Sequence, residues 1–174
     1  MTALDSRSRA RRQRGSTLIE LVMAMGVATI IMSGVSYTVL QVFNMNTRNT
    51  IYMTAVRNAQ SAGYWVALDG EKANSVIADN DSATSDVLQL TWLDVENLTD
   101  THSSNFTLEN RTLFRNVDGV KSKVAEQIDS ANAVYDAATR RLVFTVTSTV
   151  TSRNMLGSET RTYRISPRPR GGGQ

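Results

Sequence analysis

Glu20 is the residue whose chemistry most needs an explanation in this sequence. It stands in the stretch "RRQRGSTLIELVMAMG" (residues 11–26), between basic residues and an apolar run. A carboxylate within lipid costs roughly 3 kcal/mol unless it is paired, although a place near a helix N-terminus favours its negative charge. Glu20 therefore either meets a cationic partner in the membrane or is a solvated charge at the membrane edge.

No set of residues in the sequence points to catalysis. His102 is the sole histidine and lies in the polar run 99–105, where we expect a solvated loop residue rather than a base. The sequence has no cysteine, no histidine pair for a metal, no glycine-rich phosphate loop and no Gly-x-Ser-x-Gly elbow. Asp79, Asp81 and Asp86 offer oxygen ligands, but their spacing fits no defined calcium loop. We predict a protein that is not an enzyme and has no cofactor or metal.

The positive charge of the chain belongs to its first residues. Residues 1–15 carry five arginines against Asp5, whereas the remaining residues hold 14 basic and 15 acidic side chains. A near-neutral body argues against nucleic-acid binding. Four arginines do gather near the C-terminus, where we favour a solvated or partner-facing role over contact with DNA; they are Arg161, Arg164, Arg168 and Arg170.

The element that must position Glu20 is an apolar helix. Residues 21–43 contain no charged side chain and would form a helix of roughly 34 Å, enough to cross a hydrocarbon core of about 30 Å. The arginines before it place the N-terminus in the cytoplasm and the rest of the chain outside. A buried soluble helix and a cleaved secretory signal are the alternatives, but the run is long for either. Gly26 and Gly34 offer small surfaces for close helix packing.

The residues Arg14-Gly15-Ser16-Thr17-Leu18-Ile19-Glu20 resemble the processing and methylation motif of type IV pilins and type II secretion pseudopilins. The resemblance implies that a membrane-embedded prepilin peptidase cleaves between Gly15 and Ser16 and that Ser16 is then N-methylated. It also implies a partner for Glu20, namely the α-amine of a neighbouring subunit in a filament. Because glycine has no side chain, the bond after Gly15 can approach catalytic groups closely.

An amphipathic helix is expected to continue over residues 44–68. Apolar and small residues recur at spacings of four, three, four and three and form one helix face, which consists of Tyr52, Val56, Ala59, Gly63 and Val66. No proline interrupts the chain before Pro167. The sequence therefore predicts one rod from Thr17 to about Leu68, whose second half packs on a sheet.

Strands are expected in the remainder of the chain. Leu88, Leu90 and Trp92 share one face of a strand within residues 86–94. A hairpin is expected over residues 105–117, turning at Asn110-Arg111 and closed by Asp118-Gly119. Further strands are expected around Tyr135 and in the β-branched runs at residues 142–150 and 159–165.

One helix followed by four to six strands predicts the α+β class, with a long N-terminal helix packed on an antiparallel β-sheet as in pilins. The expected segments are a basic leader (1–15), a transmembrane and assembly helix (16–43), the amphipathic helix half (44–70), an extracytoplasmic β-rich domain (71–166) and a disordered tail (167–174). Looser resemblances in "NAQSAGYW", "LFRNVDG" and "RTYRISPRPR" favour a minor pilin or minor pseudopilin.

The resulting hypothesis is a structural subunit of a type IV pilus or a type II secretion pseudopilus. Its partners would be the prepilin peptidase and methylase, other pilin or pseudopilin subunits, an inner-membrane assembly platform and membrane lipid. It would lie in the cytoplasmic membrane as a single-pass protein, or in a cell-surface filament. The alternative is a single-span, membrane-anchored extracytoplasmic binding protein that does not polymerise.

Overall fold

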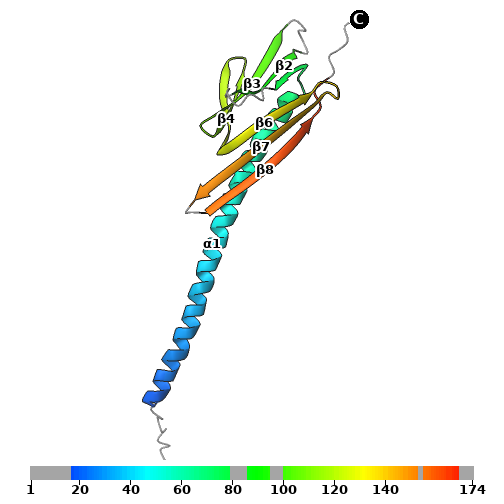
Figure 1. Ribbon diagram of the computed structural model, residues 1–174. Helices are drawn as coiled ribbons and strands as arrows, with labels where there is room; N and C mark the ends of the chain where they lie inside the picture. The colour runs from blue at the N-terminus through cyan, green and yellow to red at the C-terminus, as the bar shows by residue number, and fades with distance from the viewer. Residues whose placement is uncertain (1–16, 79–85, 95–99, 153–154, 169–174) are drawn as a thin grey trace, which may run out of the picture. The chain divides into compact units, whose positions relative to one another are not determined.

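The structure is a computed structural model that describes residues 17–78, 86–94, 100–152 and 155–168. Helix α1 (Leu18–Gly70) precedes all of the strands (Figure 1). The chain forms two compact units, divided between Asn44 and Met45. The second unit holds the end of α1 and every strand, and it is described here first.

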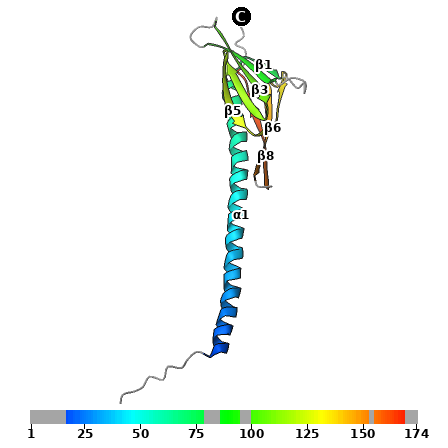
Figure 2. The same ribbon diagram turned by 90° about the vertical axis from the view of Figure 1, so that its left-hand side faces the viewer.

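The strands form two antiparallel sheets. The five-stranded sheet has the order β1-β2-β3-β4-β5, and the three-stranded sheet has the order β6-β7-β8 (Figures 1 and 2). Their bounds are β1 (Ser75–Ala78), β2 (Asp86–Leu93), β3 (Thr101–Glu109), β4 (Thr112–Val117), β5 (Val120–Glu126), β6 (Ile128–Asp136), β7 (Arg141–Ser152) and β8 (Met155–Ile165). Because each strand pairs with its neighbour in sequence, both sheets are meanders. The predicted α+β class is confirmed.

The predicted hairpin is confirmed together with its turns. Asn110 and Arg111 both have positive φ, at 48° and 61°, between the paired strands β3 and β4. Asp118 and Gly119 follow at 50° and 89° and connect β4 to β5. Two consecutive residues with positive φ match the right-handed twist of the flanking strands, which is why such two-residue turns close hairpins.

The prediction of four to six strands is wrong, because the described residues form eight. The strands that were missed carry little apolar alternation. Strand β5 is exposed along most of its length, and β1 has only four residues. Strand β6 was expected around Tyr135, and it runs from Ile128 to Asp136 in a ladder with β7. The missed strands are held by backbone pairing with their neighbouring strands.

One hydrophobic core lies between α1 and the two sheets. Its largest fully buried apolar side chains come from the strands and from one position of the helix; they are Phe106, Phe144, Leu88, Leu90, Leu113, Ile128, Leu142, Val66 and Val146. The predicted pattern in β2 is confirmed, since Leu88 and Leu90 are buried and Trp92 is half-buried. The core therefore ties both sheets to the second half of α1.

The helix face was predicted correctly at Ala59, Gly63 and Val66 and wrongly at its start. Tyr52 is 47 % exposed, and its hydroxyl donates to a carboxylate oxygen of Glu159 at 3.0 Å. Val56 is only half-buried, whereas Ile51 and Ala55 are buried in these two turns. The difference is a rotation of about one residue, because the end of the β7–β8 hairpin packs over the backbone at Ile51 rather than over Tyr52.

Small residues on this face allow the strands to lie close to the helix. A Cβ at position 63 would overlap the ring of Tyr163, whose hydroxyl donates to the Ala59 carbonyl at 3.2 Å. At position 157 of β8, a Cβ would meet Cγ2 of Ile51 at 2.8 Å. Glycine at 63 and at 157 is therefore required by contact between helix and strand, not by backbone conformation.

The last turn of α1 is fixed by a buried ion pair. Asp69 is fully buried, and its two carboxylate oxygens accept from Nε and Nη2 of Arg115 at 2.6 and 2.7 Å. The Ser104 hydroxyl donates to the same carboxylate at 2.7 Å. The guanidinium carbon of Arg115 lies 4.8 Å from the centre of the Trp65 ring. This forked arrangement joins α1 to β3 and β4, and a cation near a helix C-terminus is also favoured by the dipole.

We predict that Asp69→Asn strongly destabilises the second unit. The substitution keeps the size of the side chain but leaves the Arg115 guanidinium unpaired at a site where it is only 18 % exposed. Breaking a buried pair by neutralising one partner costs about 3–5 kcal/mol of unfolding free energy, measurable by urea denaturation. Glu109→Gln is the matched control, because it breaks the exposed Lys121–Glu109 pair and should have little effect. Equal effects of the two substitutions would contradict the role given to Asp69.

Candidate functional site

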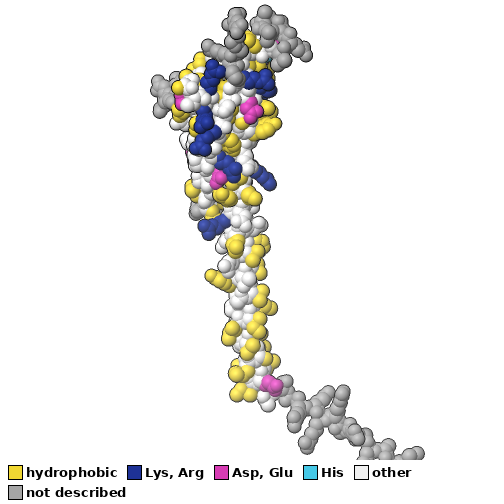
Figure 3. Space-filling view, turned by 90° about the vertical axis from the view of Figure 1, so that its right-hand side faces the viewer, with side chains coloured by type: hydrophobic (Ala, Val, Ile, Leu, Met, Phe, Trp, Pro, Cys, Tyr) yellow, Lys and Arg dark blue, Asp and Glu magenta, His cyan; other side chains and the backbone are white. Residues whose placement is uncertain are grey.

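The first half of α1 presents an exposed apolar surface in the described part of the chain. Every residue from Leu18 to Phe43 is exposed, and the large apolar side chains among them are 47–81 % exposed. Figure 3 shows these side chains along the helix, with no Lys or Arg among them on the face in view. The helix is long and apolar enough to cross a membrane. An exposed apolar surface of this extent indicates contact with lipid or with other proteins.

The serine and threonine hydroxyl groups in this apolar segment are satisfied inside the helix. Each donates to a backbone carbonyl three or four residues earlier, at 2.7–3.0 Å: Thr29 to Met25, Ser33 to Ile30, Ser36 to Met32 and Thr38 to Gly34. A hydroxyl with such a partner can enter an apolar medium without the cost of an unpaired polar group. The four hydroxyl residues therefore remain compatible with a membrane-spanning helix.

Gly26 and Gly34 have open space around them. A Cβ built at either position would meet nothing within 4 Å, in contrast to Gly63. Neither has the positive φ that would call for glycine. Nothing in the surrounding chain therefore requires glycine at these two positions, and both leave room for another helix to approach.

Glu20 lies in the first turn of α1. Its backbone N–H donates to the Thr17 carbonyl at 2.9 Å, and Glu20 is exposed. It is the acidic residue of that turn, and among the described residues it forms no salt bridge. The favourable end of the helix dipole reduces the cost of its charge but supplies no counter-ion. Gly15 and Ser16, where cleavage and methylation were predicted, lie outside the described residues.

His102 lies in strand β3 and not in a loop, so that prediction is wrong. Its Nδ1 is 2.7 Å from Oδ2 of Asp118, and its Nε2 is 3.4 Å from Oδ2 of Asp94. The imidazole also stacks on the ring of Trp92, with 5.9 Å between centroids. Strand pairing explains the error, because Trp92 and His102 are cross-strand partners and the polar sequence gave no sign of the register.

Of the three carboxylates considered as calcium ligands, only Asp86 lies within the described residues. Asp79 and Asp81 lie outside the described residues, and Asp86 accepts a long hydrogen bond from Asn105 at 3.4 Å. Within the described ranges, no group of three acidic or histidine side chains is placed to hold a metal ion.

The three C-terminal arginines within the described residues do not form one cluster. Arg161 and Arg164 point to opposite faces of β8, and Arg161 pairs with Glu159 at 3.1 Å. Arg168 follows the strand, and Arg170 lies outside the described residues. Arginines divided between two faces of one strand do not make a continuous basic surface.

Comparison with known proteins gives one match. The family model described as the prokaryotic N-terminal methylation motif matches residues 10–36, which include Gly15, Ser16 and Glu20. The match supports a pilin-like or pseudopilin-like protein that a prepilin peptidase processes, with a structural role and a single-pass membrane anchor. No curated protein and no solved structure matches the chain.

The contacts of His102 predict a stability that depends on pH. The hydrogen bond to Asp118, and secondarily that to Asp94, raises the pKa of His102 above its ordinary value of 6.5. Protonated His102 therefore stabilises the fold. This contribution is fully present below about pH 6.5 and is lost as pH rises through the raised pKa. Because His102 is the sole histidine, His102→Gln should reduce the change of the urea denaturation midpoint with pH between pH 6 and 8. An unchanged slope in the variant would contradict this assignment.

Proposed function

We propose that this chain is a minor subunit of a type IV pilus or a type II secretion pseudopilus. The observation that carries the proposal is the exposed apolar half of α1, most of which lies within the matched residues 10–36. The structural unit after Asn44 buries its own core, so this half of the helix is the part of the described chain that still needs an apolar partner. Lipid before assembly and neighbouring helices after assembly would supply it.

Processing would prepare the helix for assembly. Cleavage between Gly15 and Ser16 removes five arginines, which otherwise hold the N-terminus at the cytoplasmic face. Ser16 then becomes a new N-terminus with a methylated, cationic α-amine. The chain that remains starts with an apolar helix and carries its β-rich domain outside the cytoplasm. An inner-membrane platform would then move the helix from lipid into the filament.

Glu20 would set the position of one subunit relative to the next. Its carboxylate has no salt-bridge partner among the described residues, and a paired charge in an apolar medium is far less costly than an isolated one. The α-amine of a neighbouring subunit is the cation that processing creates within reach of such a carboxylate. Subunits that slid past one another along their apolar helices would lose this pairing. A single charge pair can therefore fix the axial offset between two subunits whose contact is otherwise apolar.

Processing is tested by mass spectrometry of the chain expressed with an active prepilin peptidase. We expect a mature N-terminus at Ser16 that carries one N-methyl group. The matched control is the same chain with an inactive peptidase, which should keep residues 1–15. An intact leader in the presence of active enzyme contradicts the proposal and favours the plain membrane anchor.

Assembly is tested by Glu20→Gln, which removes the charge and keeps the size of the side chain. We expect unchanged cleavage and membrane insertion but at least a tenfold loss of incorporation into filaments, because an unpaired amine remains in the apolar interior. Incorporation is measured in sheared filament fractions by immunoblot. Ser33→Ala is the control, since its hydroxyl bonds only within its own helix. Normal incorporation of Glu20→Gln would rule out the pairing role.

A further inference from the structure

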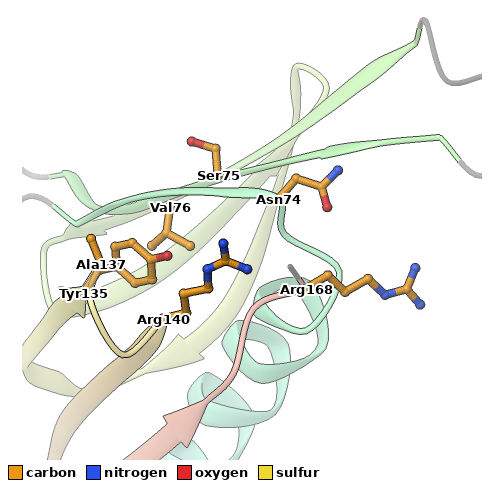
Figure 4. Close-up of a pocket in the computed structure, with 7 residues that line it drawn as sticks. All are labelled: Asn74, Ser75, Val76, Tyr135, Ala137, Arg140 and Arg168. Atoms are coloured by element: carbon orange, nitrogen blue, oxygen red, sulfur yellow. The ribbon is translucent and has the colours of Figure 1, made fainter. Parts of the chain in front are cut away.

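A small hollow opens where four segments of the second unit meet. It has a volume of about 290 Å³. Its polar lining consists of Asn74 and Ser75 at the start of β1, Tyr135 near the end of β6, Arg140 in the turn before β7 and Arg168 after β8 (Figure 4). We call it the Arg140 hollow. These residues are scattered in sequence, so only the fold brings them together.

The polar side chains of the Arg140 hollow can all donate hydrogen bonds. Two are guanidinium groups, two are hydroxyls and one is an amide, and no carboxylate is among the lining residues. With the residues that the structure describes, none of these five side chains forms a hydrogen bond or an ion pair. A lining with two positive charges and several unused donors fits an anion that has several acceptor oxygens.

Arg140 also adopts an unusual backbone conformation. Its φ is 51°, in the left-handed region that favours glycine or asparagine. The turn before it is held by Asp136, whose carboxylate accepts from the Ala138 N–H at 2.9 Å and from the Thr139 hydroxyl at 2.6 Å. Positive φ also occurs at Asn110 and Arg111 in the β3–β4 turn, so this conformation belongs to the hairpin connection between β6 and β7. The turn places Arg140 at the hollow.

Figure 4 shows how these groups are arranged. The Tyr135 hydroxyl points toward Arg140, and the Arg140 guanidinium extends toward Asn74 below β1. Arg168 lies beyond Asn74 and extends away from Tyr135. Because Arg168 is exposed, a rotation of its side chain alone could bring its guanidinium over the hollow. Arg140 is exposed as well, so both guanidinium groups can move to meet a bound anion.

We propose that the Arg140 hollow binds the phosphoryl group of a small phosphate ester. A phosphoryl group presents three oxygens in different directions, which suits donors from three chain segments, at Asn74, Tyr135 and Arg140, better than a planar carboxylate does. The Ser75 hydroxyl is directed away from these groups (Figure 4). The volume lies at the lower limit for ligand pockets and admits a small anion rather than a large ligand. The adjoining hollow is lined by Lys72, Trp92, Leu93, Asp94, His102 and Arg168. Because Asp94 is a carboxylate, this hollow suits an uncharged carrier of the phosphoryl group.

The test is calorimetric titration of the full chain in non-ionic maltoside micelles. The probes are inorganic phosphate and glycerol phosphate, at constant ionic strength against chloride. We expect saturable binding of both, with a loss of about tenfold in affinity for Arg140→Gly, because a charge-assisted pair of hydrogen bonds is removed. The same substitution relieves the strained φ, so the thermal midpoint should be unchanged or higher. A purely structural arginine would give the opposite result.

Arg164→Ala is the matched control, since Arg164 is exposed on β8 and lines neither of the two hollows. It should bind like the unmodified chain, whereas Arg168→Ala should weaken binding. The proposal is overturned if neither probe binds at millimolar concentration, if Arg140→Gly keeps its affinity, or if Arg164→Ala loses as much as Arg140→Gly. Tighter binding of a single-stranded oligonucleotide than of glycerol phosphate would overturn the assignment to a small ester.

Discussion

The arrangement of the second unit depends on one buried charge at the end of its helix. Asp69 is fully buried, and the forked contact from Arg115 offsets the cost of burying its carboxylate. Arg115 comes from β4, and Ser104, the other donor to this carboxylate, comes from β3. The pair therefore connects the last turn of α1 to the middle strands of the five-stranded sheet. Apolar packing alone would allow the helix to slide or rotate, whereas a two-pronged charged contact permits one position.

Close packing between the helix and the three-stranded sheet complements this pair. The ring of Tyr163 occupies the space that a side chain at position 63 would need, and Gly157 lies against the backbone at Ile51. These two contacts lie at different levels of the same helix, and the Asp69 pair adds a third. A rigid second half matters for the proposed function, because a subunit drawn from the membrane by its helix must carry its outer domain without unfolding it.

The first half of α1 meets a different requirement. In the proposed function it must be stable in lipid and among other helices. Its serine and threonine hydroxyls bond within the helix, and its glycines leave open space. Glu20 carries a charge in this half, and the cost of that charge is the basis for proposing a specific cationic partner. In this helix the second half is specified by contacts within the chain, whereas the first half is left for contacts between molecules.

The sequence by itself determined the long helix, its apolar half, the strand pattern around Leu88 and Leu90, and the hairpin at Asn110-Arg111. These features are local, because they follow from the composition of a run, from side-chain periodicity or from turn residues. Only the tertiary structure decided the role of Asp69, the carboxylate partners of His102, the burial of Ile51 in place of Tyr52, and the meeting of Arg140 with Tyr135 and Asn74. Each of these depends on strand register or on the rotation of the helix against the sheets. Register and rotation are set by contacts between residues far apart in the chain, and the spacing of residues within one segment carries no record of them.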